Sequence, residues 1–125
     1  MMKNIECQSD LIKIENKTYP CTVSLVMDLI GGKWKAVILY HLKENPKRYN
    51  ELRKEMPTVT ERTLSLQLKQ LEEDKIIFRK VEGQKPPIKV TYGLTEFGKS
   101  FSEVLESITT LGNSIASQKG ILINK

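Results

Sequence analysis

Apolar side chains recur every three or four positions along most of this chain, which is the spacing of one face of an α-helix. The spacing predicts helices within residues 21–32, 32–45, 48–56 and 60–75, and a last helix with a long apolar stripe over residues 95–115. Glycine or proline closes each of the first three segments. Helices therefore dominate the expected fold.

The pattern changes after residue 75 to short runs of β-branched and aromatic residues, which favour strands. Residues 76–78 and 90–92 form two such runs, and EGQKPP at residues 82–87 forms a turn between them. A two-stranded ribbon is not stable alone in water, so this ribbon has to pack on the helices. The predicted class is mainly α (α+β), with the ribbon before the final helix.

Only a few residues separate the third and fourth of these helices. Met56 and Pro57 end the first of the two, for which Asn50 is a suitable N-cap, and Thr60 is a suitable N-cap for the second. So short a gap makes the two helices turn sharply, which is typical of a helix-turn-helix motif. The second helix buries one stripe, formed by Leu64, Leu68 and Leu71.

The opposite face of that second helix carries side chains that could reach DNA. Arg62 and Lys69 can contact base edges or phosphates, and arginine is the commonest reader of guanine. Leu66 could contact a thymine methyl group, or it could rest at the edge of the core, as many single leucines do. The candidate contacts on this helix are Thr60, Arg62, Thr63, Ser65, Leu66 and Lys69.

A basic ribbon after a helix-turn-helix is typical of a winged helix, in which the ribbon contacts the phosphate backbone or the minor groove. The alternative is a solvated edge strand that lysines protect against aggregation. The candidate ribbon contacts are Arg79, Lys80, Gln84, Lys85 and Lys89. Upstream, before and on the short helix, Lys47, Arg48, Arg53 and Lys54 are candidate contacts to the DNA backbone.

The charge distribution agrees with a polyanionic partner. The chain of 125 residues has a formal net charge of +5, and residues 33–54 alone carry a net +5, while the segments before and after them are close to neutral. A central basic patch favours nucleic acid, although a charged, solvated surface that only maintains solubility is the alternative.

Other chemistry has little support in the residues. No nucleophile–base set, paired carboxylates or phosphate-binding loop is visible, and no CxxC, HExxH or histidine cluster suggests a metal or cofactor. We therefore do not expect an enzyme. The chain shows no apolar run of the roughly 18 residues that a membrane span needs and no secretory signal, so we expect a cytoplasmic protein with no membrane partner.

Three segments together resemble one family: CTVSLVMDLIGGKWKAVILYHL, RYNELRKEMPTVTERTLSLQLKQLEEDKII and PPIKVTYGLTEFG. They are similar to the HxlR-type branch of MarR-like winged-helix transcriptional regulators, over about residues 21–112. Two departures are Thr22, where the family often has proline, and Leu66, where a polar residue is usual. The second departure leaves the operator sequence open.

The resemblance implies a homodimer on a pseudo-palindromic operator, with half-sites about one helical turn apart. It divides the chain into a dimerising arm or short helix at 1–20, a DNA-binding domain at 21–95, and a C-terminal dimerisation helix and tail at 96–125. The alternative is a final helix that only packs on its own core. The implied interface residues are Phe101, Val104, Leu105, Ile108, Leu111 and Ile115.

Cys21 matches the family's N-terminal cysteine, which in some members senses oxidants or electrophiles. A working sensor needs an exposed thiolate of lowered pKa, whereas a buried cysteine is an inert, small apolar side chain. Cys7 is either a partner thiol or a tail residue, and His41 is expected to be structural.

The main hypothesis is a dimeric, sequence-specific DNA-binding regulator with double-stranded DNA, a second copy and a small oxidant or electrophile as partners. The alternative is a winged helix that binds another protein, which the basic rather than apolar ribbon disfavours.

Overall fold

The computed structural model describes residues 11–120 and residue 123, and it confirms a mainly α fold with a β wing. The elements, in chain order, are β1 (Ile12–Ile14), β2 (Lys17–Tyr19), α1 (Thr22–Ile30), α2 (Lys35–Leu42), β3 (Lys47–Arg48), α3 (Tyr49–Glu55), α4 (Glu61–Glu73), β4 (Ile77–Glu82), β5 (Lys89–Leu94), α5 (Glu96–Lys99) and α6 (Ser102–Lys119). None of the described helices combines the length and the hydrophobicity that crossing a bilayer requires.

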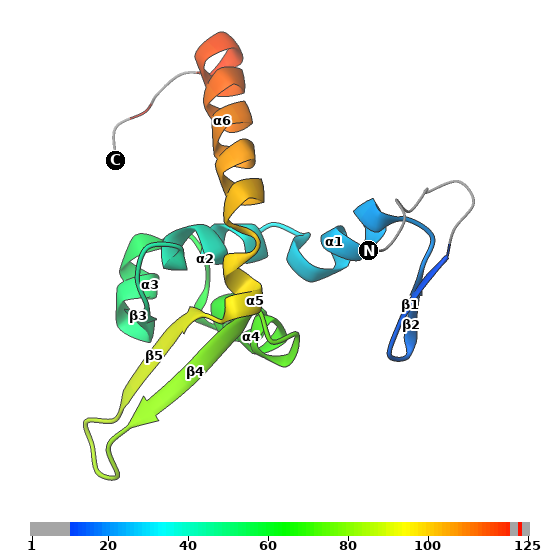
Figure 1. Cartoon of the computed structure of the whole chain (residues 1–125). Helices are drawn as coiled ribbons and strands as arrows, with labels where there is room; N and C mark the ends of the chain where they lie inside the picture. The colour runs from blue at the N-terminus through cyan, green and yellow to red at the C-terminus, as the bar shows by residue number, and fades with distance from the viewer. Residues whose placement is uncertain (1–10, 121–122, 124–125) are drawn as a thin grey trace.

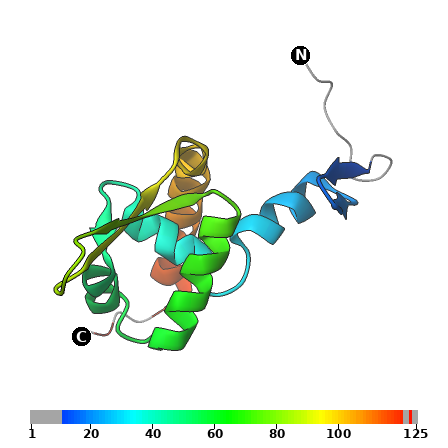
Figure 2. The same ribbon diagram turned by 90° about the horizontal axis from the view of Figure 1, so that it is seen from below.

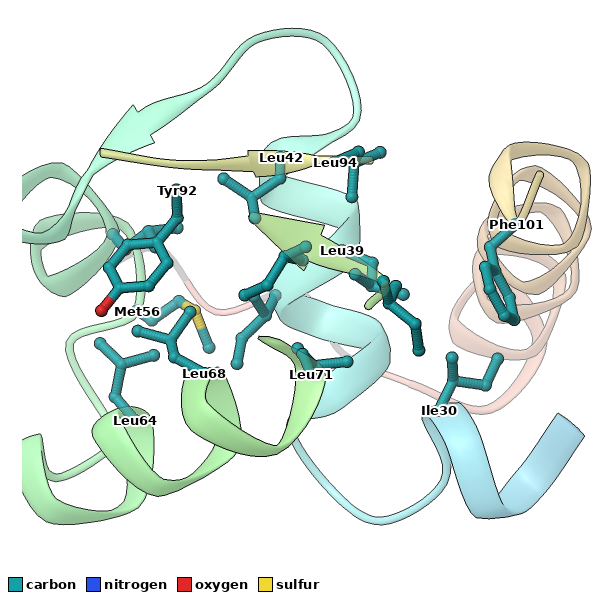
Figure 3. Close-up of a cluster of buried hydrophobic side chains, with 14 of the residues drawn as sticks. Ile30, Leu39, Leu42, Met56, Leu64, Leu68, Leu71, Tyr92, Leu94 and Phe101 are labelled. Carbon is teal, nitrogen blue, oxygen red and sulfur yellow. The ribbon is translucent and has the colours of Figure 1, made fainter. Parts of the chain in front are cut away.

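The core lies where α2, α3 and α4 meet the base of the wing (Figure 3). The predicted stripe of α4 points into it, toward Leu39 of α2, Met56 and Tyr92 of β5. Arg62, Leu66 and Lys69 of the same helix are exposed. One side of α4 thus anchors the helix in the core, and the other side faces solvent. The stripe consists of Leu64, Leu68 and Leu71, all fully buried.

Local signals set both ends of α4. The Thr60 hydroxyl oxygen accepts a hydrogen bond from the backbone N–H of Thr63 at 3.1 Å, which confirms Thr60 as the N-cap. After the helix, Lys75 takes a positive φ of 61° and turns the chain into the wing. The expected cap of α3 was wrong, because α3 begins at Tyr49 and Arg48 is its N-cap. The chain arrives there from strand β3, so Arg48 is the last extended residue.

The wing belongs to a three-stranded antiparallel sheet in the order β3-β5-β4, not to an isolated two-stranded ribbon. The third strand, β3, comprises two residues that pair with Tyr92 and Thr91. Directly paired residues share one face of a sheet. The inner face, toward the helices, therefore carries Ile77, Arg79 and Val81 of β4 with Leu94, Tyr92 and Val90 of β5, and the outer face carries Phe78, Lys80 and Glu82 with Gly93, Thr91 and Lys89.

The expected single C-terminal helix is divided into α5 and α6. The Thr95 hydroxyl caps α5 by accepting from the N–H of Gly98 at 3.0 Å, and the helical run is interrupted before α6 starts. Phe101 and Leu105 are buried in the core, which ties the start of α6 to the domain. The rest of α6 extends away from the domain (Figure 1).

The N-terminal part lies on another side of the domain (Figure 1). Where an arm or short helix was expected within residues 1–20, residues 12–14 form a strand that pairs with β2, and residues 1–10 lie outside the described part. The hairpin is joined to α1 through Asp28, which accepts hydrogen bonds from Tyr19 at 2.8 Å and Lys17 at 3.2 Å. Both hydrogen bonds lower the pKa of Asp28, and the bond from Tyr19 has the larger effect.

Candidate nucleic-acid interface

Three elements with candidate DNA contacts gather at one end of the molecule. α3, α4 and the base of the wing lie side by side at one end of the molecule, and the wing tip projects beyond them (Figure 1). Figure 2 shows this end from below. The helices turn into each other at Pro57–Thr60, as the short gap predicted. The fold therefore brings the helix-turn-helix and the wing to a common surface.

The recognition face is the exposed side of α4 and its N-cap, comprising Thr60, Arg62, Thr63, Ser65, Leu66 and Lys69. No carboxylate among residues 11–120 lies within ion-pair distance of Arg62 or Lys69. Leu66 is 50% exposed, so half of an apolar side chain faces solvent between these two cations. Thr63 is half-buried and its hydroxyl accepts from that of Thr60 at 3.0 Å.

Tyr49, at the start of α3, joins the two helices of the motif and was not singled out from the sequence. Its hydroxyl lies 3.4 Å from the hydroxyl oxygen of Ser65 on α4. The contact places an aromatic side chain directly beside the recognition face. An aromatic residue adjoining the basic pair Lys47-Arg48 was the available sequence signal.

Two of the four predicted backbone contacts are engaged within the protein. The Arg53 guanidinium donates to the Val59 carbonyl at 2.6 Å and lies 3.9 Å from Glu61, so it braces the turn of the motif. Lys47 donates to Oε1 of Glu55 at 2.5 Å. Arg48 and Lys54, by contrast, are exposed and make no ion pair within residues 11–120.

Glu55 is shared between Lys47 and a histidine. Nδ1 of His41 lies 2.9 Å from the same Oε1 atom, so the only histidine of the chain has a structural partner on α3. The hydrogen bond from Lys47, followed by that of His41, lowers the pKa of Glu55. The cluster links α2, α3 and β3, and thereby fixes the first helix of the motif to the edge of the sheet.

The sheet register separates the cations of the wing. Arg79 is on the inner face, opposite Tyr92, and Lys80 is on the outer face, where it lies 3.5 Å from Glu82. Gln84 and Lys85 are exposed in the turn, which Gly83 enters with a φ of +99°. Lys89 begins β5 opposite Glu82.

The sequence matches the HxlR-like helix-turn-helix family model over residues 29–120, most of the chain. The chain belongs to this family. Among curated relatives, the HTH-type transcriptional regulator YdeP of Bacillus subtilis is 52% identical over 85 residues, which span 68% of this chain and 66% of YdeP. The family consists of transcriptional regulators and not of enzymes, so this HxlR-like protein is a transcriptional regulator of helix-turn-helix type.

Solved structures of similar proteins share its fold. The redox regulator HypR in its oxidised form is 42% identical and superposes with a TM-score of 0.71, over 75% of this chain and 96% of that one. The diamide-treated form of YodB from B. subtilis is 29% identical with a TM-score of 0.61, over 82% of this chain and 97% of that one. The winged-helix, MarR-like architecture of this chain is therefore that of known regulators.

Cys21 of this HxlR-like protein is the N-cap residue of α1. It is half-buried and disulfide-bonded, while Cys7 lies outside the described residues. Within residues 11–120 and 123, no group of three or more His, Cys, Asp or Glu is arranged to bind a metal ion.

The predicted interface stripe of α6 separates into two groups. Phe101 and Leu105 lie in the core of the protomer itself, which matches the alternative expectation for this helix. The other four side chains are at least 40% exposed and continue along α6 beyond the domain, namely Val104, Ile108, Leu111 and Ile115.

Proposed function

We propose that this regulator binds double-stranded DNA as a homodimer, with α4 in the major groove and the wing over the neighbouring strand or minor groove. The observation that supports this most is the recognition face: Arg62 and Lys69 are exposed and unpaired within residues 11–120, beside α3 and the wing. A major groove about 12 Å wide admits one α-helix.

The side chains of this face have different roles in the proposal. Arg62 lies in the first turn of α4, where it can donate two hydrogen bonds to guanine, and such a pair discriminates by about 1–3 kcal/mol. Leu66 contacts a thymine methyl group or forms the edge of the core, since it is half-exposed. The hydroxyls of Thr60 and Ser65 and the cation of Lys69 contact phosphates.

The proposed dimer forms through the exposed apolar face of α6, together with α1. Val23 and Met27 of α1 are also exposed in the protomer. Contiguous exposed apolar patches of this kind mark interaction sites. Two-fold symmetry then presents two α4 helices to successive major grooves, which accounts for a pseudo-palindromic operator with half-sites about 34–36 Å apart.

We also propose that the redox state of Cys21 modulates DNA binding. Similar proteins include the redox regulator HypR and YodB, which has a quinone-bound form. The position of Cys21 at the N-cap of α1 connects its chemistry to an element with exposed apolar side chains. A small oxidant or electrophile is then the inducing signal, and the cytoplasm, where the DNA is, is the place of action.

Fluorescence anisotropy with duplexes from the region upstream of the protein's own coding sequence tests DNA binding. The wild type is expected to prefer one duplex over a scrambled duplex of equal length, with an affinity that falls steeply as salt rises. Arg62→Ala should reduce this preference, whereas Lys13→Ala, which removes one charge from exposed β1, should not.

The alternative function, a winged helix that binds only another protein, predicts a different outcome. The wild type would then bind no duplex at low salt, and Arg62→Ala would change nothing. That result would contradict the proposal.

A further inference from the structure

A cleft of about 460 Å³ separates the first turn of α3 from the wing. Its walls include Tyr49 and Asn50 of α3, Arg79 of β4, and Pro87 and Ile88 where the wing turn leads into β5. Its volume is within the range of about 300–1,000 Å³ that is typical of ligand sites. Arg48 and Lys89 also line the cleft, so cations occur on both sides of it, and the wing side adds apolar surface.

The register decides which of the two adjacent cations of β4, Arg79 or Lys80, faces this cleft. Arg79 pairs with Tyr92, another residue of the cleft wall, and both are on the inner face of the sheet. The next residue, Lys80, pairs with Thr91 on the outer face and lines no part of the cleft. Adjacent residues of one strand therefore place equal charges on opposite sides.

The two cations also differ in their partners. Lys80 lies 3.5 Å from the carboxylate of Glu82. Within residues 11–120, no carboxylate lies within ion-pair distance of Arg79. A guanidinium without a carboxylate, beside a polar wall, is suited to bind a phosphate through two parallel hydrogen bonds.

The cleft adjoins the recognition face. Tyr49 forms part of its wall, and the hydroxyl of Tyr49 lies 3.4 Å from that of Ser65 on α4. Figure 2 shows the wing crossing beside α3 and α4 at this end of the molecule. The cleft thus lies between α3 and the wing, next to α4, the element proposed for the major groove. In DNA, one sugar–phosphate strand separates the major groove from the minor groove proposed for the wing.

We propose that this cleft binds the DNA strand that separates the two grooves, with Arg79 holding one phosphate. Pro87 and Ile88 supply an apolar surface for the adjoining deoxyribose, and Ile88 is exposed in the free protein. The inference rests on the proposed function and adds to it: of the two adjacent cations of β4, Arg79 contacts the strand and Lys80 acts only through long-range attraction. Lys89, which also lines the cleft, adds to its positive charge.

A comparison of Arg79→Gln with Lys80→Gln tests this assignment, because the two variants lose the same charge at adjacent positions. Anisotropy titrations on the preferred and the scrambled duplex give the slope of log affinity against log salt. Each lost phosphate contact lowers that slope by about 0.9. For two symmetric contacts in a dimer, the fall in affinity between 50 and 200 mM salt should be about 12-fold smaller in Arg79→Gln than in wild type.

Lys80→Gln should change the slope by less than half as much, and Arg79→Lys, which keeps the charge, should retain the wild-type slope. Single neutral methylphosphonates along the strand then locate the contact. One position should weaken wild-type and Lys80→Gln binding while leaving Arg79→Gln binding unchanged. Circular dichroism melting of each variant verifies that the fold is retained.

Equal effects of Arg79→Gln and Lys80→Gln on the slope, or no methylphosphonate position that couples to Arg79, would overturn the cleft assignment. If inorganic phosphate at millimolar concentration binds wild type but not Arg79→Gln and does not displace DNA, the cleft binds a free anion and the strand assignment also fails. A wild type that binds no duplex would instead contradict the proposed function itself.

Discussion

The exposed face of α6 gives a prediction whose size follows from the structure. Leu111 is 62% exposed in the protomer, so a dimer through this face can remove about that fraction of its surface from water. Full burial of a leucine side chain contributes about 1.5–3 kcal/mol. Burial of the fraction that is still exposed in the protomer then contributes about 1–2 kcal/mol per protomer, and the two copies together contribute about 2–4 kcal/mol per dimer.

Leu111→Ala should therefore weaken dimerisation by about 30- to 800-fold, since each 1.4 kcal/mol corresponds to a factor of ten. Sedimentation equilibrium over a range of concentrations measures the dimer dissociation constant. Leu66→Ala is the matched control, because Leu66 is 50% exposed on the recognition face of α4, away from α6. Its dimer dissociation constant should equal that of the wild type.

An unchanged dissociation constant in Leu111→Ala would refute the assignment of α6 to the interface. A protein that sediments as a monomer at all concentrations would refute the dimer. Equal weakening by Leu66→Ala and Leu111→Ala would show that the loss arises from general destabilisation, and the assignment would fail in this case also.

Three further predictions concern Arg53, Glu55 and the proposed redox residue Cys21. Arg53→Met removes the hydrogen bond to the Val59 carbonyl, so it should destabilise the protein by about 1.5–3 kcal/mol in urea unfolding; an unchanged midpoint would exclude the brace. Glu55 has a lowered pKa, so its stabilisation is present above its ordinary pKa of 4.5 and is lost as pH falls through the folded value; Glu55→Gln should lose stability less steeply below about pH 5 than wild type. Once the Cys21 disulfide has been reduced, diamide should change the operator affinity of the wild type, and Cys21→Ser should abolish this effect; a retained response would assign the switch elsewhere.

The parts of the fold that were predicted correctly depend on local signals. The threonine cap and the three leucines of α4 lie within four turns of helix, and this spacing alone fixes which side is buried. Strand β3 carries no such signal. It is two residues long and exists because β5 is available to pair with it.

The sequence predicted which residues belong to the candidate site better than it predicted how they are arranged. Charge alone suggested that Lys47 and Arg53 contact DNA, but their partners Glu55 and Val59 become neighbours only when α3 packs against β3 and α4. Likewise, Arg79 and Lys80 were both expected from the sequence to contact DNA, and only the register with β5 places them on opposite faces. Tyr49 gains its contact with Ser65 from the turn between the two helices.

Hydroxyl-radical footprinting on the upstream duplex tests the central claim most directly. The account predicts two protected half-sites related by two-fold symmetry, about one helical turn apart, and the loss of both in Arg62→Ala at a concentration that saturates the wild type. Uniform protection of every duplex, or a footprint that Arg62→Ala leaves unchanged, would contradict the claim that α4 recognises the operator.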